Sequence, residues 1–152
     1  MERHGWRLLF YTEFSRQRGR LKDAAERAQR RDPGRAVSNS NVKLLRAVDR
    51  AILEVIPQDP SRPEYRQGNT LGRDYRHWRR VKIGRRFRLF FRYDAKAKVI
   101  VYAWMNDEST LRASGSKTDP YAAFTRMLAQ GNPPNDWASL IAGSAQHPSP
   151  EQ

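Results

Sequence analysis

Basic side chains are interspersed with strand-forming apolar residues through the middle of this chain. Residues 62–98 hold thirteen Arg or Lys against three acidic residues, a charge of +10 out of the chain's +13. Within this stretch, residues 78–83 and 87–93 are rich in the aromatic and aliphatic side chains that favour β-strands. A disordered basic tail would lack such residues, so the pattern predicts a folded, strongly basic antiparallel hairpin.

The density of this charge indicates what the hairpin binds. Positive charge on a folded surface attracts polyanions, and counterion release makes nucleic acid the default partner. Twenty-three of the twenty-nine basic residues are Arg, whose planar guanidinium binds phosphate at two points and stacks on bases. For any single Arg, a solvated position on a half-buried sheet is the stronger interpretation. For the group, like charges on neighbouring strands repel unless an anion compensates them, so we favour phosphate binding.

Length and composition restrict the class of protein. A chain of 152 residues with 38% hydrophobic content suits one domain, which we place at residues 1–141, followed by a disordered tail at 142–152. Because Cys is absent and the three His are scattered, we expect no metal and no cofactor. The apolar run at residues 8–11 is too short for a signal peptide or membrane span, so we expect a cytoplasmic protein without membrane contact.

Apolar periodicity predicts an α+β fold. The expected elements are a strand at residues 6–10, a helix at about 11–31, a second helix carrying the apolar residues between 42 and 55, strands at 78–83, 87–93 and 99–106, and a short helix from 120. The two long helices should form an antiparallel hairpin, with Ser38, Asn39 or Ser40 capping the second one. The three later strands are joined by short turns and should form an antiparallel meander.

Alternation along the meander assigns its side chains to two faces. Val81 and Ile83 fall on the expected core face. We expect four cations to converge on the opposite, exposed face: Arg80, Lys82, Arg88 and Arg92. Trp78 shares that face, and both it and Trp104 have two possible roles. Packing in the core is the commoner role for a large aromatic on a strand, and stacking on an RNA base is the alternative.

Several motifs carry a resemblance to a known family. They lie at Trp78–Lys82, Arg86–Tyr93, Ala103–Arg112 and Lys117–Tyr121, with a further specific segment at Gly131–Trp137. Together with the order of elements, they resemble the RelE-like superfamily of bacterial toxins, and more closely its YhaV branch, over about residues 6–137. The resemblance implies an N-terminal strand and helical hairpin packed on a small antiparallel meander, with a short C-terminal helix.

The resemblance also implies an activity and partners. It points to the toxin of a type II toxin–antitoxin system, an RNA endonuclease that cleaves mRNA, often at the ribosome, and so inhibits translation and growth. A PrlF-like antitoxin would silence it and bring it into a DNA-bound autoregulatory complex. Two alternatives remain open from composition: a non-catalytic RNA- or DNA-binding protein that uses the same basic sheet, and a module whose basic face docks an acidic protein.

Site residues follow from the same resemblance. Arg80, Lys82 and Arg88 match basic catalytic positions of the family on the first two strands of the meander. The family's Arg or His after the last strand has no clean counterpart here. The candidate catalytic residues are Arg80, Lys82, Arg88, Asp107, Glu108 and Arg112. The candidate RNA-binding residues are Trp78, Arg79, Arg86, Arg92, Lys117 and Tyr121, with helix packing as the alternative for the last.

Metal-free RNA cleavage requires a base for the ribose 2′-hydroxyl, stabilisation of the charged phosphorane and an acid for the leaving 5′-oxygen. We expect Arg80 and Arg88 to hold the scissile phosphate. Lys82, in the neutral form that neighbouring cations favour, or a carboxylate of Asp107 or Glu108, is the expected base.

Overall fold

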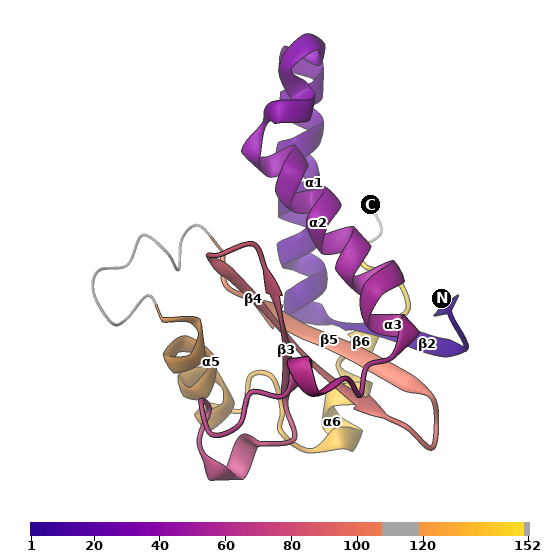
Figure 1. Ribbon diagram of the computed structural model, residues 1–152, viewed down its shortest axis with the longest axis vertical. Helices are drawn as coiled ribbons and strands as arrows, with labels where there is room; N and C mark the ends of the chain where they lie inside the picture. The colour runs from indigo at the N-terminus through magenta and orange to yellow at the C-terminus, as the bar shows by residue number, and fades with distance from the viewer. Residues whose placement is uncertain (108–118, 151–152) are drawn as a thin grey trace.

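A mixed β-sheet forms the centre of the molecule (Figure 1). The computed structural model describes residues 1–107 and 119–150. The strands are β1 (Glu2–Arg3), β2 (Trp6–Tyr11), β3 (Arg79–Ile83), β4 (Phe87–Asp94), β5 (Val99–Met105) and β6 (Ser144–Ala145). Their order is β1-β2-β5-β4-β3, with β6 on β2. The antiparallel meander β3-β4-β5 is confirmed, whereas β2 runs parallel to β5 and makes the sheet mixed.

Two antiparallel helices form the predicted hairpin, which rises above the sheet in Figure 1. Helix α1 (Thr12–Arg31) is followed by the 3₁₀ segment η1 (Pro33–Ser38) and by α2 (Ser40–Arg50). Of the three predicted caps, Asn39 is the one used, because its Oδ1 accepts from the amides of Asn41 and Val42 at 2.9 and 3.2 Å. Arg18 and Asp49 join the helices through two 2.7 Å contacts, a two-point pairing that fixes their relative position.

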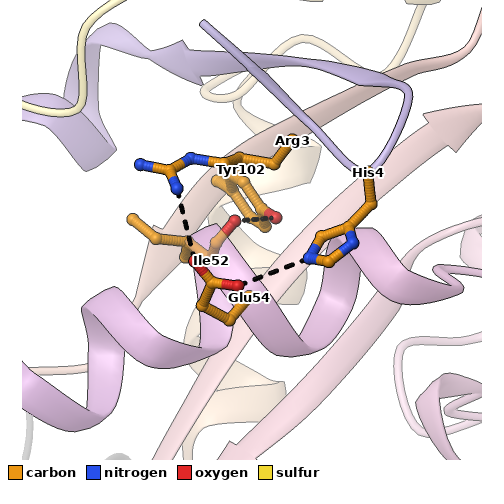
Figure 2. Close-up of polar contacts among 5 residues, drawn as sticks. All are labelled: Arg3, His4, Ile52, Glu54 and Tyr102. Carbon is orange, nitrogen blue, oxygen red and sulfur yellow. Dashed lines mark hydrogen bonds and ion pairs between the residues drawn. The ribbon is translucent and has the colours of Figure 1, made fainter.

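The second helix changes its winding where it crosses the sheet. Residues Ala51–Val55 form the π-helical segment η2, which leads into the short helix α3 (Ile56–Gln58). Figure 2 shows the fully buried Tyr102 donating its hydroxyl to the Ile52 carbonyl oxygen at 2.7 Å. Burial raises the pKa of that phenol well above its usual value. Two residues after Ile52, Glu54 contacts Arg3 and His4, both at 3.3 Å, and so ties the N-terminal hairpin to the helix.

Both faces of the sheet are covered by helices. One core lies between the sheet and the helical hairpin, where Phe10, Phe14 and Phe91 have no exposed surface. The second core lies under α5 (Pro120–Ala129) and α6 (Trp137–Ala142). There the rings of Phe90 and Phe124 stack at 4.3 Å. The α+β class is therefore confirmed, but the expectation of a freely exposed basic face is wrong, because α5 and α6 cover much of it.

The described residues after α6 pack on the domain. Whereas the sequence predicted no structure after residue 141, Ser144 and Ala145 pair with Tyr11 and Phe10 as strand β6. Farther on, Ser149 accepts a hydrogen bond from Arg18 through its Oγ. Helix α6, which the periodicity did not predict, brings the chain to this position. None of the helices within the described ranges is long and apolar enough to cross a membrane.

Candidate active site

The turn between β3 and β4 brings the predicted catalytic cations together. Lys82 lies directly opposite Arg88 in the β3–β4 register, and Arg80 is the next residue of β3 on the same face. Side chains directly opposite each other on antiparallel strands have Cβ atoms about 4.5–5.5 Å apart. None of the three forms an ion pair with an acidic side chain of residues 1–107 or 119–150. We call these three residues the hairpin triad.

Hydrogen bonds to nearby backbone and side-chain oxygens hold Arg88 in place. Its Nη1 donates to the carbonyl oxygens of Phe87 and Arg85 at 2.8 and 3.2 Å, and its backbone amide donates to Asn106 Oδ1 at 2.7 Å. Asn106 is fully buried and donates through Nδ2 to the Arg86 carbonyl at 2.9 Å. The Arg88 Nε is buried and has no hydrogen-bond partner among the described residues. The guanidinium is thus positioned by local carbonyls and retains donors for an anion.

Sequence reasoning missed the role of Asn106. The sequence signal was a polar residue directly after the apolar strand β5, where a side-chain amide can reach backbone groups of the neighbouring strand. Because it bonds both Arg86 and Arg88, this amide fixes the start of β4 and the backbone that carries the candidate catalytic arginine.

Helix α5 positions the second arginine of the triad. Arg80 donates from Nε to the Tyr121 hydroxyl at 2.8 Å and from Nη1 to the Glu64 carbonyl at 2.7 Å. Tyr121 is held at the start of α5 because Asp119 caps that helix and accepts from the Tyr121 amide at 3.0 Å. Its ring meets Phe90 edge-on at 5.7 Å. Tyr121 therefore orients Arg80 and packs on the core. The Arg80 Nη2 is left to face a ligand.

Arg92 and Trp78 are engaged by the C-terminal segment. The Arg92 guanidinium is over the rings of Trp78 and Trp137, 5.5 and 5.2 Å from their centroids, and donates to the Asn135 carbonyl at 2.6 Å. Burial lowers its pKa, partly offset by the nearby Asp136 carboxylate. Trp78 is fully buried and donates from Nε1 to Asn135 Oδ1 at 3.0 Å. This burial supports the core role of Trp78 over base stacking.

The remaining candidates are dispersed. Arg79 points to the opposite face of β3, where it lies over Tyr93 at 5.8 Å, and Arg86 is exposed beside Phe87. Asp107 follows Asn106 and is half-buried at the wall of a cavity of about 530 Å³ between α1 and α5. Three predicted site residues lie outside the described residues: Glu108, Arg112 and Lys117. No group of three or more His, Asp or Glu suited to a metal ion occurs in the described ranges.

Comparison with known proteins supplies the context for this site. A family model described as "Toxin with endonuclease activity, of toxin-antitoxin system" matches residues 8–145. The "Toxin YhaV" of Escherichia coli O6:H1 is 44% identical over 139 residues, which cover 90% of each chain. The "Ribonuclease toxin YhaV" of Escherichia coli K12 is 43% identical with the same coverage. No solved structure matches this chain.

Proposed function

Because this chain belongs to the YhaV family of toxins with endonuclease activity from toxin–antitoxin systems, we propose that it is a ribonuclease that cleaves mRNA without a metal ion. Cleavage of mRNA would inhibit translation and arrest growth. The relative from Escherichia coli K12 is named a ribonuclease, which supports RNA as the substrate of this chain too.

The hairpin triad is the observation that carries this proposal. Lys82 and Arg88 face each other across two strands, with Arg80 beside them, and no acidic partner among the described residues neutralises them. Such an arrangement of like charges is favourable when an anion lies between them. A phosphodiester that gains charge in a pentavalent transition state is the anion that benefits most, since preorganised donors need no reorganisation during the reaction.

Each residue of the triad has a place in the reaction. The free Nη2 atoms of Arg80 and Arg88 bind the non-bridging oxygens of the scissile phosphate. Lys82 or the Asp107 carboxylate takes the proton of the ribose 2′-hydroxyl. The 2′-oxygen then attacks phosphorus, the bond to the 5′-oxygen breaks, and that oxygen receives a proton from the conjugate acid or from water. The products are a 2′,3′-cyclic phosphate and a free 5′-hydroxyl.

Partners follow from the family. A toxin of a toxin–antitoxin system has an antitoxin, and we propose that it is PrlF-like and brings the toxin into a DNA-bound regulatory complex. Action on ribosome-bound mRNA in the cytoplasm belongs to the same proposal. The strong local charge of residues 62–98 supports it, because ribosomal RNA and mRNA both attract such a surface.

Incubation of a defined mRNA with purified protein in EDTA, with and without ribosomes, tests this function. Discrete fragments ending in a cyclic phosphate are expected, and a requirement for ribosomes would appear as cleavage in one arm only. If the RNA is retarded on a gel but stays intact in both arms, and expression does not arrest growth, the non-catalytic binding protein replaces the ribonuclease.

A further inference from the structure

Three arginines line a hollow away from the hairpin triad. Its volume is about 260 Å³, and its walls are Arg66, Gly68, Arg76 and Arg79. Arg66 and Arg79 meet across an isolated antiparallel bridge at the edge of the sheet. Arg76 is brought close because its carbonyl accepts from Arg79 Nη1 at 3.0 Å. We call Arg66, Arg76 and Arg79 the edge cluster.

The loop that carries Arg66 and Arg76 is held by a buried amide. Gln67 is 4% exposed, donates to the Tyr75 carbonyl at 2.8 Å and accepts from the Leu71 amide at 3.2 Å. These bonds join the two ends of the segment between the exposed arginines. The backbone positions of the edge cluster are therefore set before any ligand arrives, which lowers the entropic cost of binding.

No described acidic side chain forms an ion pair with any arginine of the edge cluster. The Arg79 Nε is buried and has no hydrogen-bond partner in the described residues. A single exposed Arg needs no partner, but three guanidinium groups around one hollow repel each other, and a buried donor without an acceptor is unfavourable. An anion in the hollow relieves the repulsion between these guanidinium groups.

The chemistry of the walls selects phosphate. The walls offer guanidinium forks and one glycine and no apolar side chain, which disfavours an amphipathic peptide. Pockets for drug-sized ligands start near ~300 Å³, so this hollow suits a phosphate with part of its sugar better than a whole nucleotide. Arg79 and Arg80 are consecutive on edge strand β3 and point to opposite faces, so one RNA strand crossing that edge can reach both groups.

We propose that the edge cluster binds a backbone phosphate of the substrate RNA, at a nucleotide other than the one cleaved, and so holds the strand across β3. The proposal rests on the proposed ribonuclease function and adds a second contact point to it. Such a contact positions RNA without reading its sequence.

The test is binding of 2′-O-methyl RNA, which has no 2′-hydroxyl to react and stays intact whatever the activity of the protein. The Arg66→Gln/Arg76→Gln variant should bind this RNA about tenfold more weakly, and the slope of log affinity against log salt should fall by about one to two. With cleavable RNA, KM should rise and kcat stay unchanged. The control Arg73→Gln/Lys96→Gln removes the same charge from exposed positions outside the hollow and should keep most of the affinity.

Three results would overturn the proposal. Equal losses in the variant and its control would mean a general charge effect. The hollow is a free-phosphate site if RNA binding is unchanged and inorganic phosphate raises the melting temperature of the wild type but not that of the double variant. Unchanged RNA binding with weaker antitoxin binding would mean a protein-docking site. If the double variant is unfolded, Arg76→Gln alone is measured instead, because the Arg76 side chain is exposed and forms no hydrogen bond or ion pair within the described residues. If the wild type binds RNA but never cleaves it, the ribonuclease function is wrong. The comparison of RNA binding between the double variant and its control still tests the edge cluster in that case.

Discussion

Two arginines of strand β4 share one face of the sheet but have different surroundings. Arg92 is enclosed by Trp78 and Trp137 and bonded to the backbone of Asn135. Among the described residues, the side chain of Arg88, four residues earlier, donates to local carbonyls through Nη1 and faces Lys82. Arg92 stabilises the packing of the C-terminal segment. No described segment after β4 encloses Arg88 in this way, and its guanidinium is available to an anion. Charge on a strand therefore indicates a binding surface only where no later part of the chain covers it.

The largest expected effect is at the covered end. Trp78→Ala should lower the free energy of unfolding by about 3–5 kcal/mol, because it empties a fully buried site beside Phe124 and removes the bond to Asn135. Urea denaturation followed by circular dichroism measures this loss. A loss below about 1 kcal/mol would show that the tryptophan is not the packing centre described here.

Asn106→Ala should come next and should affect both stability and activity. It leaves the Arg88 amide and the Arg86 carbonyl without their partner, for about 2–4 kcal/mol in total, and frees the backbone under the hairpin triad. The cleavage rate per folded molecule should also fall in Asn106→Ala. Gln17→Ala is the matched control, since Gln17 is a buried amide bonded to the Met105 backbone rather than to β4. Equal activity in the two variants would contradict the positioning role of Asn106.

Arg92→Ala should destabilise the fold by about 1–3 kcal/mol, through the lost cation–π contacts and the charged hydrogen bond. Cleavage per folded molecule should remain near the wild-type value. Thermal melts and initial cleavage rates on one RNA measure these two effects. A rate that falls while the melting temperature holds would place Arg92 in the active site and remove the contrast with Arg88.

The smallest effect concerns pH. Burial lowers the pKa of His77, with the bond to Asn135 opposing this shift, so the folded state binds its proton less readily than the unfolded chain. Stability should therefore be full above the unfolded pKa of about 6.5 and decline as pH falls below it. Because the ring is partly exposed, the decline should be small. Melting temperatures between pH 5 and 8 should vary less with pH in His77→Gln, and identical profiles would remove His77 as the cause.

Local sequence patterns predicted most elements of this fold. Helical spacing marked the two long helices, and strand-forming residues with short turns marked β3, β4 and β5, because these signals depend on neighbouring residues. The parallel pairing of β2 with β5 and the packing of α6 depend on contacts between distant segments, which no local pattern records. The contact of Arg92 with Trp137 also joins distant segments, so no local pattern predicts it.

The candidate site was predicted in part. Alternation placed Arg80, Lys82 and Arg88 on one face, and the observed register brings them together. Alternation also placed Arg92 on this face, which is correct, but the expected convergence of Arg92 with the other cations is wrong because Trp78 and Trp137 enclose it. The contact between Arg80 and Tyr121 joins β3 to α5 across 41 positions, so its geometry required the fold.

The catalytic role of Arg88 is tested by the cleavage of one 5′-labelled RNA in EDTA, measured for the wild type, Arg88→Ala and Arg92→Ala. Loss of one preorganised donor to the developing charge lowers rates by about a hundredfold or more, so Arg88→Ala should be nearly inactive with an unchanged melting temperature. Arg92→Ala should cleave at close to the wild-type rate at a temperature where it is folded. Full activity in folded Arg88→Ala would contradict the catalytic role of Arg88.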